Sequence, residues 1–289
     1  MKSAHIVILG PTCSGKSACA VELAHRIDAE VISCDSMQIY RGLEIGTAQP
    51  SMEERAGIPH HLIGERDIHE PYDVNRFLEQ CKGHLRRLEA AGKRAVIVGG
   101  TGLYAKALVY GHVLPPSEPA LAERIRRINE TPEGHSALME ELEKAAGGPA
   151  AIPRDLVLNP RHFTRACEVF RLTGMLPWQL NPPNAVPSDE FRQVILLPDF
   201  GELKERIRFR TRRMLEAGWV DEARRACEAG LLESPTARQA LGYKDIHAYL
   251  ESGKEDPEGL WTVLSNRTIQ YARRQIGRAS CRERVLPTV

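Results

Sequence analysis

The sequence of 289 residues contains no hydrophobic run that approaches the roughly 20 residues of a membrane-spanning helix. Its start leads directly into a strand-like apolar run at residues 6–9, without the layout of a secretory signal peptide. We therefore expect a protein of the cytoplasm that has no membrane partner.

Paired cysteines are also lacking. The seven cysteines are dispersed and form no C-x-x-C pair, and such an odd set argues against both a disulfide framework and a zinc site. Internal repeats and low-complexity segments are absent as well. Hydrophobic residues make up 42% of the chain, which is enough to build the core of a globular protein.

A net charge of +1 hides a local concentration of basic residues, because residues 204–213 hold six lysines and arginines. A solvated helix face is the ordinary explanation of such a run, but a polyanionic partner is not excluded. On a helix, Arg206, Arg210 and Arg213 share one side. They therefore line a diphosphate site or an RNA backbone, or else they face solvent.

Short β-branched runs alternate with helical periodicity in the first third of the chain, a rhythm typical of βαβ units on a parallel sheet. Strand signals then disappear, proline pairs flank charged helical segments, and one more strand returns the chain to the sheet. The expected strands lie at 6–9, 30–34, 95–98 and 194–197. The expected helices lie at 17–27, 74–91, 121–128, 164–172, 202–217, 220–229 and 260–275.

Residues 10–17 read Gly-Pro-Thr-Cys-Ser-Gly-Lys-Ser and fit the phosphate-binding pattern G-x-x-x-x-G-K-[ST] between a predicted strand and a predicted helix. The glycines let the backbone approach a phosphate, and the helix N-terminus supplies N–H donors. Lys16 adds charge, and Ser17 offers a ligand for Mg²⁺. The alternative is a glycine-rich turn that binds nothing. The expected diphosphate- or nucleotide-binding residues are Gly10, Pro11, Thr12, Cys13, Ser14, Gly15, Lys16 and Ser17.

Two further polar segments, 33–42 and 99–104, follow predicted strands, and open α/β sheets place their ligands at the carboxyl ends of strands. A usual P-loop NTPase ends an apolar strand with an aspartate that helps to hold Mg²⁺, but the strand at 95–98 leads into glycines instead. Asp35 is the carboxylate at a strand end. It suits a general base or a metal partner, or it caps the following turn.

These elements predict an α/β fold with a P-loop NTPase-like parallel sheet flanked by helices and a mainly helical insertion domain. We expect the catalytic core at 1–112 and 191–275 and the insertion at 113–190. Residues 276–289 do not continue the preceding amphipathic pattern and resemble a translated sequencing adapter, so we expect a non-native tail there.

The motifs at 10–17, 35–42, 45–48, 59–62 and 99–104, taken in order, resemble those of the bacterial tRNA dimethylallyltransferases, which form the IPP transferase family. The resemblance covers nearly all of the chain before Ile276. It continues at 165–169, 173–174, 210, 214, 218, 242–244 and 268–275.

The resemblance implies a transferase whose P-loop clamps the pyrophosphate of dimethylallyl diphosphate, with Arg210 as a further ligand and Mg²⁺ neutralising charge on the leaving group. Asp35 would take a proton from the N6 amine of the adenosine 3′-adjacent to the anticodon while the amine attacks the donor. Thr101 would hydrogen-bond a pyrophosphate oxygen. Asp35 and Thr101 are therefore the expected catalytic residues, in a monomeric enzyme.

The resemblance also implies that a tRNA anticodon stem-loop is the partner and that the target base leaves its stack. The residues expected around that base are Asp35, Ser36, Met37, Gln38 and Thr101. The residues expected to bind tRNA elsewhere are Arg124, Arg161, His162, Phe163, Thr164, Arg165, Gln239, Gly242, Tyr243, Lys244, Thr268, Gln270, Arg273 and Arg274. Gln49, Ala122 and His162 replace basic residues usual in the family, which predicts a lower affinity for RNA.

Two other classes of protein stay open from the sequence. A P-loop nucleotide or small-molecule kinase is supported by residues 10–17, but not by the strand that ends without aspartate. An RNA-binding module without catalysis would conflict with the presence of Lys16, Asp35 and Thr101. His60 and His61 suggest a metal pair, but neighbours on a strand point to opposite faces, so we expect structural roles for them.

Overall fold

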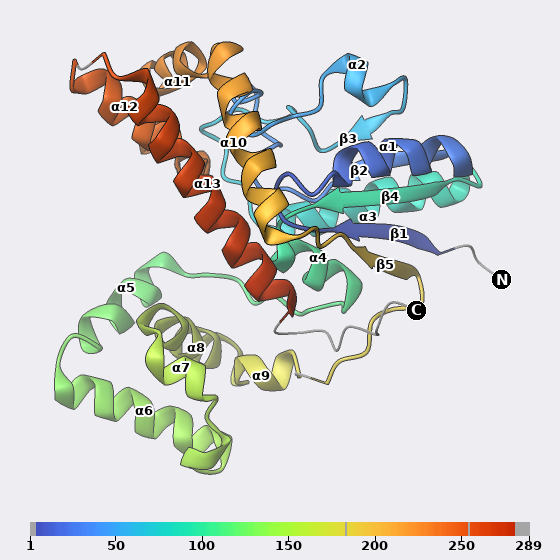
Figure 1. The fold of residues 1–289 in the computed structure, drawn as a ribbon. Helices are drawn as coiled ribbons and strands as arrows, with labels where there is room; N and C mark the ends of the chain where they lie inside the picture. Colours follow the sequence, from blue (N-terminus) through green and yellow to red (C-terminus); the bar gives the residue numbers. More distant parts are fainter. Residues whose placement is uncertain (1–3, 183, 254, 281–289) are drawn as a thin grey trace. The chain divides into compact units, whose positions relative to one another are not determined.

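The computed structural model describes residues 4–182, 184–253 and 255–280, and the chain divides into two compact units (Figure 1). Met1–Val109 and Ser188–Val289 form the first unit, and Tyr110–Pro187 form the second. The sequence-based boundaries of the insertion, 113 and 190, each lie three residues further along the chain. Among the described residues, no helix has both the length and the apolar character needed to cross a membrane.

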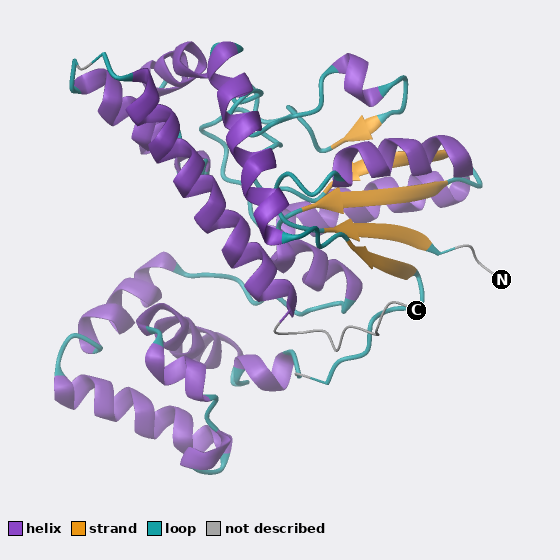
Figure 2. Cartoon of the chain, in the orientation of Figure 1, coloured by secondary structure: helices purple, strands orange, loops and turns teal. Residues whose placement is uncertain are grey.

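A five-stranded sheet with the strand order β3-β2-β4-β1-β5 forms the centre of the first unit, and Figure 2 shows it in orange. Every pairing in it is parallel, which confirms the predicted sheet type. The strands are β1 (His5–Leu9), β2 (Ala29–Ser33), β3 (His60–His61), β4 (Arg94–Gly99) and β5 (Phe191–Ile195).

Helices cover both faces of this sheet, because the side chains of a strand alternate between the two faces. On one face, Ala20 and Ala24 of α1 (Lys16–Ile27) share a core with Val96 and Val98 of β4. On the other face, α3 (Val74–Ala90) packs against β4. The short helix α2 (Met52–Arg55) precedes β3, and α4 (Gly102–Val109) follows β4.

The C-terminal part of the first unit is helical: α10 (Phe200–Glu216), α11 (Trp219–Glu228), α12 (Tyr243–Glu251) and α13 (Pro257–Ser280). The long helices α10 and α13 lie side by side in Figure 1 and bury Leu203, Ile207 and Ala272 between them. Helix α13 extends five residues into the segment predicted to be non-native, and Ile276 packs against that core. The rest of that predicted tail, residues 281–289, lies outside the described residues.

The second unit has a separate hydrophobic core. Its helices are α5 (Pro119–Ile128), α6 (Pro132–Ala146), α7 (Arg154–Leu158), α8 (Pro160–Thr173) and α9 (Pro177–Leu180). Phe163 and Cys167 of α8 pack with Leu138 and Leu142 of α6 and with Ile125 of α5. Because these apolar side chains bury one another, the insertion is stabilised largely by its own contacts.

The chain leaves and re-enters the first unit at one point. The backbone N–H of Ser188 donates a hydrogen bond of 2.8 Å to the carbonyl oxygen of Val109. These two residues are the last one before the insertion and the first one after it. The chain of the second unit therefore begins and ends at one hydrogen-bonded pair of residues, Val109 and Ser188, which we call the neck.

Candidate active site

The turn between β1 and α1 has the backbone conformation of an anion-binding loop. Cys13 and Gly15 have positive φ angles of 62° and 85°, with Ser14 between them, and such alternation forms a backbone nest whose N–H groups converge. A Cβ atom at Gly10 would lie 2.7 Å from the Leu196 carbonyl oxygen, so only glycine fits there. The residues predicted to bind a phosphate are therefore continuous, with 10–15 in this loop and Lys16 and Ser17 at the start of α1.

Lys16 is half-buried, and its ammonium group donates a 3.1 Å hydrogen bond to the carbonyl oxygen of Pro11. Burial lowers its pKa to about 8; the negative charge of Asp35 opposes that shift, and the positive charge of Arg210 adds to it. An incoming polyanion would favour the charged form of Lys16.

Arg210 is the residue of the basic run that reaches the loop. Its guanidinium donates a hydrogen bond to the hydroxyl oxygen of Thr12. Arg206 instead pairs with Glu202 on the surface of α10, and Arg213 is exposed. The three arginines share a helix side as predicted, but the structure brings one of them to the phosphate loop.

Asp35 follows β2 and holds the turn that comes after it. Its Oδ1 accepts hydrogen bonds from the backbone N–H groups of Met37 at 2.9 Å and Gln38 at 3.4 Å. The turn-capping role considered from the sequence is therefore present, and it orients the carboxyl group. Both amides bond to Oδ1 and not to Oδ2.

Thr101 lies beside this turn although it follows a different strand. Its hydroxyl oxygen accepts a 3.1 Å hydrogen bond from the N–H of Ser36, and its own N–H donates to the Cys34 carbonyl oxygen at 3.3 Å. A Cβ atom at Gly99 would lie 2.0 Å from that carbonyl oxygen, so glycine is needed for this approach. The carboxyl ends of β2 and β4 thus join the two predicted catalytic residues.

The side-chain amide of Gln38 makes hydrogen bonds within the protein. Its Oε1 accepts from the hydroxyl of Ser33 at 3.0 Å, and its Nε2 donates to the carbonyl oxygens of Thr47 at 3.3 Å and Ala48 at 3.0 Å. These bonds use both amide hydrogens. They hold the segment after β2 as a closed loop, and contact between Gln38 and a base stays a prediction.

Glu222 was not among the residues singled out from the sequence, yet it fixes the same segment. This carboxylate is 3% exposed and accepts hydrogen bonds from the N–H groups of Ile45 at 2.7 Å and Gly46 at 2.8 Å and from the hydroxyl of Tyr243 at 2.7 Å. The sequence gave no signal for this role, because an isolated glutamate on an amphipathic helix normally faces solvent. Burial raises the pKa of Tyr243, so its hydroxyl stays protonated and donates.

Several residues predicted to bind tRNA are solvent exposed: Arg124, Arg161, His162, Gln239, Lys244, Gln270, Arg273 and Arg274. Others are buried in the protein: Phe163, Gly242, Tyr243 and Thr268. Thr164 is half-buried. Arg165 is also half-buried and donates to the Pro115 carbonyl oxygen at 2.6 Å and to Glu168 at 2.5 Å. Only the side chains of the exposed residues are accessible to a polyanion from solvent.

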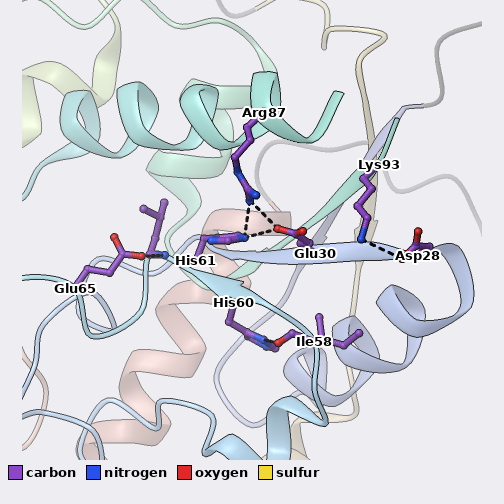
Figure 3. Close-up of polar contacts among 9 residues, drawn as sticks. Asp28, Glu30, Ile58, His60, His61, Glu65, Arg87 and Lys93 are labelled. Carbon is purple, nitrogen blue, oxygen red and sulfur yellow. Dashed lines mark hydrogen bonds and ion pairs between the residues drawn. The ribbon is translucent and has the colours of Figure 1, made fainter. Parts of the chain in front are cut away.

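His60 and His61 point to opposite faces of β3, as predicted (Figure 3). His61 makes a 2.7 Å contact with Glu30 and stacks on the ring of His84, whereas Nδ1 of His60 bonds to the Ile58 carbonyl oxygen at 2.8 Å. Burial opposes the charge of Glu30, but hydrogen bonds from His61 and Arg87 outweigh it and lower the pKa of the carboxyl. The histidines therefore have structural partners at the sheet edge.

The parallel sheet, the loop after β1 and the polar turns after β2 and β4 define a protein of the P-loop-like α/β class. The family profile described as IPP transferase matches residues 38–277. The chain belongs to the IPP transferase family.

Similar proteins support this assignment over most of the chain. A tRNA dimethylallyltransferase of Streptomyces griseus is 39% identical over 93% of this chain and 85% of its own length. A tRNA dimethylallyltransferase of Thermus thermophilus is also 39% identical, over 84% of this chain and 79% of its own.

Two solved structures have the same fold. The tRNA isopentenylpyrophosphate transferase of Bacillus halodurans matches with a TM-score of 0.68 at 32% identity, covering 96% of this chain and 87% of the other. A eukaryotic dimethylallyltransferase acting on tRNA matches with a TM-score of 0.79 at 26% identity, covering 95% and 69%. The relatives fit the transferase prediction and not the kinase alternative.

Proposed function

We infer that the protein is a tRNA dimethylallyltransferase. It transfers a dimethylallyl group from dimethylallyl diphosphate to the N6 amine of the adenosine 3′-adjacent to the anticodon, and it releases pyrophosphate. The observation that carries this proposal is the joined turn of Asp35 and Thr101 at the edge of a phosphate loop, in a chain of this family. A base and a site for the leaving group then lie together at the carboxyl ends of β1, β2 and β4.

The phosphate loop binds the donor. Residues 12–17 supply N–H groups and the charge of Lys16, and Arg210 adds a second cation beside Thr12. Ser17 is exposed at the second position of α1, and its hydroxyl, water and substrate phosphate oxygens together suit Mg²⁺, which prefers oxygen ligands. When bound, Mg²⁺ supplies charge neutralisation on the pyrophosphate.

Asp35 acts on the attacking amine, and Thr101 acts on the leaving pyrophosphate. A bond forms between N6 of the adenine and the first carbon of the donor while the bond from that carbon to the pyrophosphate oxygen breaks. The proton of the amine passes to Oδ2 of Asp35. Because the Thr101 oxygen accepts the Ser36 N–H, its own hydrogen remains for donation to the departing pyrophosphate.

The tRNA partner supplies the adenosine. The base must leave its stack to reach Asp35, and Ser36 and Met37 flank that carboxylate in half-buried positions. Exposed basic residues of α13 and of the insertion suit the phosphate backbone of an anticodon stem-loop. A monomer in the cytoplasm is the setting we expect for this reaction.

The test is incubation of the purified protein with Mg²⁺, dimethylallyl diphosphate and unmodified tRNA that carries adenosines 3′ of its anticodon. Nucleoside mass analysis is expected to find N6-prenylated adenosine. Folded protein that forms no such product but converts ATP to ADP with a small acceptor would overturn the proposal in favour of a kinase.

A further inference from the structure

Gln275 near the end of α13 connects two turns that lie far from it in the sequence. Its Oε1 accepts a hydrogen bond of 2.9 Å from the backbone N–H of Thr12, and its Nε2 donates one of 3.1 Å to the carbonyl oxygen of Gly100. Thr12 belongs to the turn after β1, and Gly100 to the turn after β4. One side chain thus spans the two loops that carry the phosphate site and Thr101.

The two ends of this bridge are next to the groups that handle the donor. Arg210 donates to the hydroxyl of the same Thr12 whose N–H Gln275 binds. Gly100 directly precedes Thr101, whose hydroxyl accepts the N–H of Ser36. A change in the length of the bridge therefore moves the phosphate loop relative to Thr101 and to the turn that Asp35 holds.

The side-chain amide of Gln275 is closely packed against the turn that it binds. A Cβ atom at Gly100 would lie 2.3 Å from Nε2 of Gln275, so the amide group sits directly against this backbone. Cys13 of the loop and Ile276 of α13 pack against the same core of Leu203, Ile207 and Ala272. Helix and loop are in contact on the apolar side as well as through the amide.

The chemistry of the bridge requires an amide. One end faces an N–H and needs an acceptor, while the other faces a carbonyl oxygen and needs a donor, so the orientation of the amide follows from its partners. A carboxylate would keep the first bond and place a negative oxygen against the Gly100 carbonyl. A shorter amide would reach only one of the two turns.

We propose that Gln275 is a positioning residue that sets the spacing between the phosphate loop and the Gly100–Thr101 turn, and thereby aligns the pyrophosphate with Thr101 and Asp35. This inference rests on the proposed function. Misplacement of reacting groups by about 1 Å can cost on the order of 10²-fold in rate. The residue is therefore expected to matter for the chemical step and for donor binding, but not for tRNA affinity.

The experiment compares Gln275→Ala, Gln275→Glu and Gln275→Asn with the wild-type enzyme in steady-state prenyl transfer, varying the donor and the tRNA in turn. We expect kcat to fall by about 10- to 100-fold in the Ala and Glu variants, and KM for dimethylallyl diphosphate to rise. KM for tRNA should stay within about twofold, because the amide is bonded inside the protein. The kcat of Gln275→Asn should lie between that of the wild-type enzyme and those of the Ala and Glu variants. Asn75→Ala, an exposed amide on α3, is the matched control and should behave as wild type.

Calorimetric titration of each variant with inorganic pyrophosphate and Mg²⁺ supplies a readout that does not depend on turnover. Weaker pyrophosphate binding with an unchanged melting temperature supports positioning. A lower melting temperature with unchanged pyrophosphate affinity and unchanged KM values would show a merely structural residue and overturn the proposal. Wild-type kinetics in all three variants would overturn it too, whereas an inactive wild-type enzyme would instead refute the proposed function.

Discussion

At the scale of single residues, the proposed reaction gives the carboxyl group of Asp35 a second role beside its role in the fold. Oδ1 caps the turn after β2, and the proposed reaction assigns the proton of the amine to Oδ2. Asp35→Asn keeps an oxygen for the capping bonds but removes the basicity. We expect the variant to fold and bind donor normally, while single-turnover prenyl transfer slows by at least about 100-fold.

The control for this variant is Asp35→Ala, which removes the cap as well as the base. It should lose the same catalytic factor and, in addition, about 1 kcal/mol of stability measured by urea unfolding. Turnover by Asp35→Asn at the wild-type rate would exclude Asp35 as the base.

Lys16 is expected to make donor binding at the proposed site depend on pH. Because burial lowers the pKa of Lys16 to about 8 in the free protein, the side chain is charged below that pH and neutral above it. Binding a pyrophosphate favours the charged form, so above pH 8 the lysine must take up a proton on binding. Affinity for dimethylallyl diphosphate is therefore expected to fall as the pH rises through about 8.

Calorimetry at pH 9 in two buffers of different ionisation enthalpy measures that proton uptake directly. Wild-type protein should take up protons as it binds inorganic pyrophosphate, and Lys16→Ala should bind weakly without this uptake. Identical affinity at pH 7 and pH 9 would contradict the assignment.

The residues of the site fall into two groups by how they could be predicted. Lys16, Asp35 and Thr101 each follow a predicted strand, so their positions at one edge of the sheet followed from local pattern. Gln275 and Glu222 bond to backbone groups 263 and 177 residues away in the sequence. Nothing local to either residue encodes such partners, and their roles appeared only with the tertiary structure.

At the scale of elements, helix α11 holds the segment after β2 through Glu222. Glu222→Ala would leave the N–H groups of Ile45 and Gly46 and the Tyr243 hydroxyl without their acceptor. An unsatisfied buried donor costs about 1–3 kcal/mol, so we expect a loss of about 3 kcal/mol in the free energy of unfolding, measured in urea. Glu228→Ala, an exposed position on the same helix, should change it by less than about 0.5 kcal/mol.

One glycine in a turn and one in a helix should respond oppositely to substitution by alanine. A Cβ atom at Gly46 would lie 2.2 Å from Nε1 of Trp219 and 2.4 Å from the hydroxyl of Tyr243, whereas one at Gly83 in α3 meets nothing within 4 Å. Gly46→Ala should therefore destabilise by about 1–3 kcal/mol through overpacking. Gly83→Ala should stabilise by about 0.5–1 kcal/mol, since alanine favours the helix. Equal shifts in melting temperature for the two variants would refute this contrast.

The predicted elements were most accurate where both faces are buried. Strand β5 was placed three residues late, because Arg192 and Val194 of this edge strand are exposed and the apolar run at 194–197 extends past its end. Helix α6 was not predicted, although Thr131 accepts from the N–H of Gly134 and caps its start, and Gly147 ends it. Those capping signals were readable from the sequence; the exposure of an edge strand was not.

At the scale of the whole molecule, the neck at Val109 and Ser188 makes the insertion separable. Replacing residues 110–187 by a short glycine-serine linker keeps the paired ends and removes a unit with its own core. The shortened protein should fold, by circular dichroism, and bind inorganic pyrophosphate with near wild-type affinity. Its KM for tRNA should rise by at least about tenfold, because exposed basic residues such as Arg124 and Arg161 are lost.

The outcomes for the two substrates separate the roles of the two units. Loss of pyrophosphate binding in a folded shortened protein would show that the insertion helps to form the donor site. An unchanged KM for tRNA would remove the insertion residues from the RNA contacts.

The same neck has a consequence in polymer terms. An insertion whose ends are already held together acts on the host sheet as a closed loop, and the entropy of closing a loop grows only with the logarithm of its length. Doubling the length of the inserted segment would cost the sheet about 0.6 kcal/mol. We therefore expect insertions of different length to be exchangeable between Val109 and Ser188 at little cost in the free energy of folding of the first unit.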